Sequence, residues 1–144
     1  MPLTVSDERR ESHVQAARRF FDLLATKDID TWIELWHEQG RIIVPYPPAG
    51  FGASIDGKAQ ILTAFQGLFR NYESFQSTVT AIYPAADSDA VCVEYTNQAV
   101  ITGGVEYTNT NIAVFKFQDG LIIAYHDYFD PRRFQTVIDA LAEK

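Results

Sequence analysis

Residues 121–131, with the sequence LIIAYHDYFDP, carry two side chains that could move protons, His126 and Asp127, in a segment that is otherwise apolar or aromatic. A carboxylate in a buried strand costs free energy unless it is paired or used. Burial also raises its pKa towards the neutral range that a general acid or base needs. Asp127 is therefore the candidate catalytic residue. The alternative is a structural carboxylate bound by Asn111, a tyrosine hydroxyl or the backbone.

Neighbouring side chains of a strand point to opposite faces, so His126 and Asp127 cannot form a catalytic dyad. The turn before the strand decides which of them faces the interior. If residues 119–120 form a two-residue turn, His126 shares the face of Asn111. If residues 118–120 form a three-residue loop, Asp127 lies opposite Asn111 instead. Both faces of this strand are apolar, so the residues alone leave the choice open.

Polar side chains on the two preceding strands could orient a ligand. The Gly103-Gly104 sequence between these strands suits a two-residue hairpin turn. Such a turn sets Asn109 opposite Gln98 and Asn111 opposite Thr96. The odd-numbered face of the strand 105–117 is the more apolar, so both asparagines should face a concave interior. An apolar pocket with a few polar groups is the usual design of a ligand site; the alternative is a polar ladder that packs the interior or lies at its rim.

Aromatic residues could form the walls of such a pocket, although aromatic residues on helix faces more often belong to the plain core. Tyr46 and Phe51 lie in a Pro/Gly-rich loop, which suits a lid or rim. The predicted substrate-binding residues are Asn111, Asn109, Thr96, Gln98, Tyr125, Trp36, Phe20 and Tyr46.

Other chemistry finds little support in the sequence. His13, His37 and His126 are scattered without the paired spacing of a metal site. Cys92 has no histidine or second cysteine near it and suits the core. Phosphate loops, nucleotide fingerprints and nucleophile elbows are not found. We therefore expect neither a metal nor a cofactor.

The 144 residues and 47% hydrophobic content fit one domain, residues 1–144, with a full core. The net charge of −7 argues against nucleic acid or an anionic membrane as a partner, because both select clustered Lys and Arg. No apolar run approaches the ~18 residues of a membrane span. The single cysteine and the polar first 13 residues indicate a cytoplasmic protein.

The elements that must position these residues change in character along the chain. Apolar residues at helical spacing predict three helices. The first is capped by Ser6 and the third covers 57–69. The second is short, begins at the cap Asp28, reaches Trp36 and ends at Gly40. A strand over 41–46 and a loop over 47–54 separate the last two helices. Period-two alternation then predicts strands over 72–83, 90–101, 105–117 and 121–129, and Asp130-Pro131 opens a last helix. Helices followed by an antiparallel meander indicate an α+β fold, with helices covering one face of a curved sheet.

The order of elements and the phrases VPYPPAGF, YTNTNIAVFKFQDGLI and YHDYFDP resemble the SnoaL-like superfamily over about residues 13–142. This is the cone-shaped α+β fold shared with ketosteroid isomerase and nuclear transport factor two, and the nearest branch is the PhzA/PhzB-like proteins. The resemblance implies a pocket-facing acid on the last strand at the position of Asp127, which supports the three-residue loop. The family residue is a Glu, so Asp127 is one methylene shorter.

The resemblance also tests a steroid-isomerase mechanism. The positions of the general base, the helix-one tyrosine and the acidic oxyanion donor correspond to Val44, Phe20 and Ala113. All three matches fail, so steroid isomerase activity of the usual kind is not expected.

These observations lead to two hypotheses. The first is a small cofactor-independent enzyme that uses Asp127 as acid or base on a cyclic or polyketide-like metabolite, by isomerisation, cyclisation, dehydration or condensation. The second is a non-catalytic ligand-binding or accessory module of the same fold. An enclosed cavity of roughly a few hundred Å³ at Asp127 would favour the first, and a filled cone or a salt-bridged Asp127 the second.

We also expect a homodimer. The even-numbered face of 105–117 carries Ile112 and Val114, and the next strand adds Ile122, Ala124, His126 and Tyr128 if Asp127 faces inward. Such a patch is too apolar to leave in water. Members of the superfamily commonly pair through this face, which would place His126 at the interface.

Overall fold

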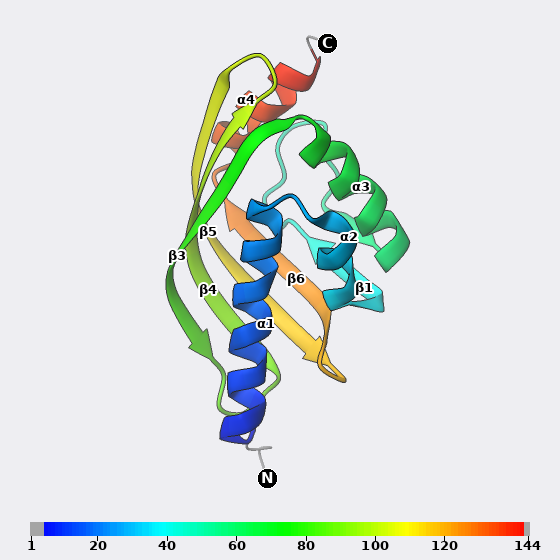
Figure 1. Cartoon of the computed structure of the whole chain (residues 1–144), viewed down its shortest axis with the longest axis vertical. Helices are drawn as coiled ribbons and strands as arrows, with labels where there is room; N and C mark the ends of the chain where they lie inside the picture. Colours follow the sequence, from blue (N-terminus) through cyan, green and yellow to red (C-terminus); the bar gives the residue numbers. More distant parts are fainter. Residues whose placement is uncertain (1–4, 143–144) are drawn as a thin grey trace.

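The computed structural model describes residues 5–142, so the outermost residues of the expected 1–144 domain lie outside the described part. A curved six-stranded sheet wraps around one long helix, with shorter helices at its rims (Figure 1). The elements in chain order are α1 (Asp7–Ala25), α2 (Ile29–Trp32), the 3-10 turn η1 (Ile33–Leu35), β1 (Trp36–Ile43), β2 (Ser54–Asp56), α3 (Lys58–Arg70), β3 (Tyr72–Pro84), β4 (Ala90–Ile101), β5 (Val105–Gln118), β6 (Leu121–Phe129) and α4 (Pro131–Ala142).

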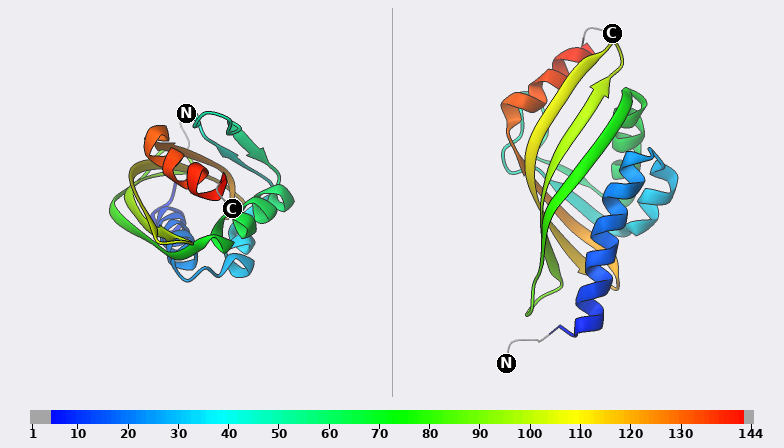
Figure 2. Two further views of the ribbon diagram at one scale, coloured as in Figure 1. Left: turned by 90° about the horizontal axis from the view of Figure 1, so that it is seen from above. Right: turned by 60° about the vertical axis from the view of Figure 1, so that its left-hand side comes forward.

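The sheet has the strand order β2-β1-β6-β5-β4-β3 and is curved without closing. The last four strands form the predicted antiparallel meander, and β1 joins β6 in parallel. α1 runs along the concave side, whereas α4 packs on β5 near the β4–β5 hairpin (Figure 2). The predicted α+β cone, with three helices in its N-terminal half and a short C-terminal helix, is confirmed.

The predicted helix starts are confirmed by their caps. Ser6 Oγ accepts a hydrogen bond from the backbone N–H of Arg9, at 3.2 Å, and Asp28 Oδ1 accepts one from Thr31, also at 3.2 Å. Each bond satisfies a backbone donor that the first helical turn leaves unpaired. The helix α1 thereby directs the ring of Phe20, 1% exposed, into the concave core.

The predicted second helix is too long. The chain leaves the helical conformation at Trp36, whose backbone is extended (φ −98°, ψ 140°), so this residue begins β1. Gly40 lies inside β1 and does not end a helix. Its backbone approaches the Trp36 indole so closely that a Cβ would come within 2.7 Å of Cε3. The strand therefore spans 36–43 instead of 41–46, and β2 begins at Ser54, the last residue of the predicted loop.

The predicted register of β4 and β5 is wrong by one residue. Ile101 pairs with Val105, and the turn holds three residues, closed by a 2.9 Å hydrogen bond from the Gly104 N–H to the Ile101 carbonyl. Asn111 therefore lies opposite Tyr95, not Thr96. Asn109 likewise lies opposite Asn97, not Gln98.

The turn before β6 combines parts of both alternatives. It is the two-residue turn, because Asp119 and Gly120 have positive φ (54° and 78°) and Gln118 pairs with Leu121. A β-bulge then inserts Ile123, because Phe117 pairs with Ile122 but Lys116 pairs with Ala124. An extra residue reverses the alternation of faces beyond it.

The bulge gives Asp127 the inward position that the resemblance implied. Asp127 pairs with Ala113, so the expected pairing with Asn111 is wrong. His126 pairs with Val114 and points to the outer face. The two adjacent residues thus serve opposite sides of the sheet, as predicted.

Candidate functional site

A cavity of about 80 Å³ lies inside the cone. Apolar and aromatic side chains of α1, α3, β3 and α4 form most of its wall, and polar groups of β3, β4, β5 and β6 complete it. Asp127 is one of these polar groups. The cavity is smaller than the 300–1,000 Å³ typical of sites for drug-sized ligands.

Asp127 is half-buried, and both of its hydrogen bonds reach the same oxygen. Oδ1 accepts from the Tyr95 hydroxyl at 2.7 Å and from Asn111 Nδ2 at 3.3 Å. Oδ2 accepts no hydrogen bond from the described residues. Burial raises the pKa of Asp127 to about 6, although the bonds from Tyr95 and Asn111 act to lower it. A carboxyl with this pKa exchanges its proton near neutral pH, which suits acid–base catalysis.

Two tyrosines extend this network away from the carboxylate. The Tyr95 hydroxyl also lies 2.7 Å from the Tyr125 hydroxyl. Because a phenol has one proton, a Tyr95 that donates to ionised Asp127 must accept from Tyr125. Burial raises the pKa of Tyr95 and of Tyr125 well above the ordinary value, so both remain protonated. The result is a directed chain of donors that ends on Oδ1 of Asp127.

Asn111 braces the same network from β5. It is 3% exposed, and its Nδ2 donates to the Tyr95 hydroxyl at 3.2 Å as well as to Asp127. Its Oδ1 is buried without a hydrogen-bond partner among residues 5–142. The side chain therefore lines the cavity with an acceptor that is not used within the described protein.

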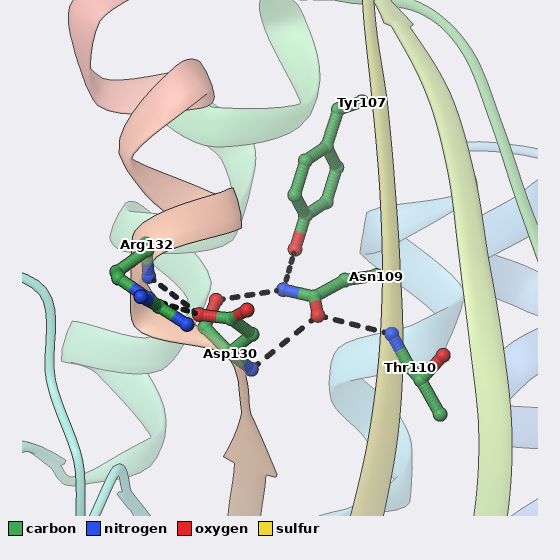
Figure 3. A network of polar contacts seen from close by, with 5 residues as sticks. All are labelled: Tyr107, Asn109, Thr110, Asp130 and Arg132. Atoms are coloured by element: carbon green, nitrogen blue, oxygen red, sulfur yellow. Dashed lines mark hydrogen bonds and ion pairs between the residues drawn. The ribbon is translucent and has the colours of Figure 1, made fainter.

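Asn109 is engaged in a different network (Figure 3). Its Nδ2 donates to the Tyr107 hydroxyl at 2.8 Å and to the Asp130 carbonyl at 3.0 Å. Its Oδ1 accepts from the backbone N–H groups of Thr110 and Asp130, at 3.0 and 3.3 Å. Asn109 therefore ties β5 to the start of α4, and the cavity wall does not include it.

The same network orients Tyr107, which does line the cavity. Its hydroxyl oxygen accepts from Asn109, and its own proton has no acceptor among the described side chains. Burial raises the pKa of Tyr107, so the phenol stays protonated at neutral pH. Tyr107 can therefore donate a hydrogen bond to an oxygen atom in the cavity.

The other predicted binding residues divide between cavity, core and surface. Tyr125 and Phe20 line the cavity, whereas Trp36 is fully buried in the neighbouring core. Tyr46 is 65% exposed and packs near Tyr128 instead. Thr96 and Gln98 lie on the outer face, opposite Thr110 and Thr108, because of the one-residue shift in register.

That shift also explains which cavity residues the sequence interpretation missed. Tyr95 and Asn97 occupy the inward positions that were assigned to Thr96 and Gln98. The sequence of β4 does carry a signal for the correct face, because the odd positions 91 to 101 hold mostly apolar side chains. These positions are also the more buried ones in the structure. Ser77 on β3 also lines the cavity and donates to Asn97 Oδ1 at 2.6 Å.

Two further classes of site were tested in the described part of the chain. Residues 5–142 hold no group of three or more His, Cys, Asp or Glu side chains arranged to bind a metal ion. Within the same range, no helix combines the length and the hydropathy that a bilayer crossing requires.

A curved, unclosed sheet wrapped around a helix is the architecture of cone-shaped α+β proteins. The SnoaL-like domain family matches residues 17–125, and the chain belongs to this family. This finding confirms the resemblance seen in the sequence.

Relatives from two bacteria share most of the chain. The uncharacterised protein YesE of Bacillus subtilis is 32% identical over 84% of this chain and 83% of its own length. The uncharacterised PhzA/B-like protein PA3332 of Pseudomonas aeruginosa is 30% identical over 77% of this chain and 79% of its own. A crystal structure of a B. subtilis protein, for which an isomerase role has been suggested, is 28% identical with a TM-score of 0.81, covering 91% of this chain and 95% of that one.

Proposed function

We propose that the protein is a small enzyme that transfers a proton on a cyclic or polyketide-like metabolite, with Asp127 as the acid–base group. The observation that carries this proposal is a carboxyl group with a pKa of about 6 and one free oxygen in an aromatic-walled cavity. Tyr95 and Asn111 fix the other oxygen, which leaves Oδ2 available to a ligand. The suggested isomerase role of the B. subtilis protein is consistent with this chemistry.

The arrangement supplies both partners that removal of a proton beside a carbonyl group requires. Asp127 Oδ2 accepts the proton from carbon. Negative charge then develops on the carbonyl oxygen, and a donor placed at that oxygen stabilises the transition state. Tyr107 is positioned by Asn109 to be this donor. Isomerisation, cyclisation, dehydration and condensation can all begin with this step, and it uses no cofactor.

The steroid-isomerase residues are not part of this proposal. The corresponding positions Val44, Phe20 and Ala113 are all buried and apolar in the structure. Asp127 instead enters the cavity beside Ala113, its partner across β5 and β6. The proposed acid–base group therefore comes from a different strand position on the same fold.

A second candidate is a ligand-binding or accessory module without catalysis. The volume of about 80 Å³ favours this alternative, since it is well below that of drug-sized ligand sites and suits only a compound as small as a single ring. For a larger metabolite, the aromatic wall of α3 and α4, which includes Phe65 and Phe134, must move outward.

Deuterium exchange at the α-carbon of cyclopentanone tests the proposed chemistry with a probe of suitable size. In D2O the protein should accelerate the exchange measured by proton NMR. The rate should rise with pH through about 6, because the ionised form of Asp127 is the base. Asp127→Asn should abolish the acceleration, and His126→Asn, the matched change on the outer face, should not. Binding of cyclopentanone without accelerated exchange would favour the binding module.

A further inference from the structure

The amide of Asn111 has only one orientation that fits its surroundings. Nδ2 donates to the Tyr95 hydroxyl at 3.2 Å and to Asp127 Oδ1 at 3.3 Å. The reverse orientation would place the amide oxygen against a carboxylate oxygen, and the Tyr95 proton is already given to Asp127. While Asp127 is ionised, Oδ1 of Asn111 is therefore the atom that remains without a donor.

This oxygen is an unusual feature for a protein interior. Asn111 is 3% exposed, and no donor among residues 5–142 reaches its Oδ1. Buried side-chain oxygens are nearly always hydrogen-bonded, so an unpaired one calls for an explanation. Asn111 lines the same cavity as Asp127, so a ligand in that cavity can supply the missing donor.

We propose that Asn111 determines the specificity of the cavity by accepting a hydrogen bond from a ligand hydroxyl or N–H group. The inference rests on the proposed function, since it assigns the ligand class of the same site. The substrate is then a small ring ketone that also carries a hydroxyl or N–H group, and a phenol is a simple probe for that second group. Analogues with an apolar or ether group in its place leave Oδ1 unpaired and bind more weakly.

The physical chemistry predicts a weaker preference for the hydroxyl compound when this acceptor is removed. At a position without an acceptor, a hydroxyl loses its hydrogen bonds to water and gains none. Only the free oxygen of Asp127 then remains in the cavity wall to accept from it. With Asn111 present, the hydroxyl recovers a bond inside the cavity, whereas the methyl compound leaves a buried oxygen unsatisfied.

The experiment compares para-fluorophenol with para-fluorotoluene, which differ by one hydroxyl-to-methyl exchange, by fluorine NMR titration. At about pH 7.5, above the pKa of about 6, Asp127 is ionised and cannot donate to Asn111. The wild type should bind the phenol at least about tenfold more tightly. Asn111→Leu should lose most of this preference, because only the free oxygen of Asp127 then remains to accept from the hydroxyl. Gln98→Leu is the matched control, because the same change on the exposed outer face should leave the wild-type preference unchanged.

Three results would overturn the inference: tighter binding of the toluene by the wild type, a preference for the phenol that is undiminished in Asn111→Leu, or no binding of either probe at millimolar concentration. If Asn111→Leu does not fold, Asn111→Val takes its place, since valine suits a strand. These outcomes are separate from the proposed function. A phenol preference without deuterium exchange contradicts catalysis only, and exchange without a phenol preference contradicts the role of Asn111 only.

Discussion

Tyr95 on β4 donates a 2.7 Å hydrogen bond to Asp127 on β6, although β5 lies between their strands. The residue of β5 that pairs with Asp127 is Ala113, which is fully buried. Its single methyl group leaves space for the phenol to reach over the intervening strand. A small side chain at this position is therefore what connects the donor network to the carboxylate.

Replacing Tyr95 with phenylalanine should raise the pKa of Asp127 above about 6. Burial raises this pKa, and the hydrogen bond from Tyr95 is the largest influence that lowers it. Carbon NMR of the carboxyl groups measures the change directly, and the pH dependence of cyclopentanone exchange should move to higher pH with it. Tyr107→Phe is the matched control for the NMR measurement of the pKa, because the Tyr107 hydroxyl bonds to Asn109 and not to Asp127. An unchanged pKa in Tyr95→Phe would show that the Tyr95 bond does not stabilise the carboxylate.

Asp127→Asn should gain stability relative to the wild type as the pH rises. The pKa of Asp127 is about 6 in the folded protein and 3.8 without the fold. The folded state therefore binds the proton more tightly, and this stabilisation is complete below about pH 4 and is lost as the pH rises through about 6. The shift corresponds to at most about 3 kcal/mol. Asparagine has no such titration, so the difference in unfolding free energy between variant and wild type should move in favour of the variant from pH 4 to about pH 7.

Urea unfolding at several pH values provides the measurement. Gln98→Leu controls for a general effect of pH, because it changes no titratable group and lies on the outer face. A difference between Asp127→Asn and the wild type that stays constant with pH would contradict a carboxyl titrating near neutrality.

The helix starts could be predicted from the sequence because a cap depends mainly on the capping residue itself. Ser6 and Asp28 bind their first turns as expected. The extent of the second helix could not be predicted in this way. The residues up to Trp36 suit a helix by spacing, and the pairing of Trp36 with Ile122 of β6, far along the chain, places it in a strand.

The facing of the site residues shows a similar limit. Strand boundaries follow from local turn residues, but register depends on one-residue differences that turns and bulges introduce. Thr102 belongs to the turn and does not pair with Val105 as predicted. Tyr95 therefore occupies the inward position that the prediction gave to Thr96. The bulge at Ile123 has no local signal, since both faces of β6 are apolar. The resemblance placed Asp127 correctly because it compares whole folds.

Asn109→Ala should destabilise the fold without directly altering the cavity wall. The change leaves the N–H groups of Thr110 and Asp130 without an acceptor and removes the donor to Tyr107. Unsatisfied buried groups cost about 1–3 kcal/mol each. Thr110 is exposed and Asp130 partly buried, so we expect a loss of roughly 1–2 kcal/mol and a melting temperature lower by roughly five degrees. Calorimetry tests this expectation. Stability within 0.5 kcal/mol of wild type, a margin of roughly the size of surface effects, would contradict the role of Asn109 as a tie between β5 and α4.

The outer face of the sheet leads to the last prediction, a homodimer. Ile112 at the centre of β5 is 41% exposed, and the partly buried Val114 and His126 lie beside it. We propose that a second copy of the chain covers this face, since clustered apolar side chains mark interfaces. Ile112→Lys should therefore produce a monomer in sedimentation velocity, whereas Gln60→Lys on α3, away from this face, should not.

His126 adds a dependence on pH to the proposed dimer. Burial lowers its pKa, and the charges of Lys116 and Arg41 lower it further. Protonation below the ordinary value of 6.5 would bury a cation beside two others. The dimer should therefore weaken towards about pH 5, and His126→Asn should remove most of that weakening. A wild-type monomer at tens of micromolar, roughly the regime of weak specific association, would contradict the dimer. A dissociation constant in His126→Asn that varies with pH as in the wild type would contradict the role of His126.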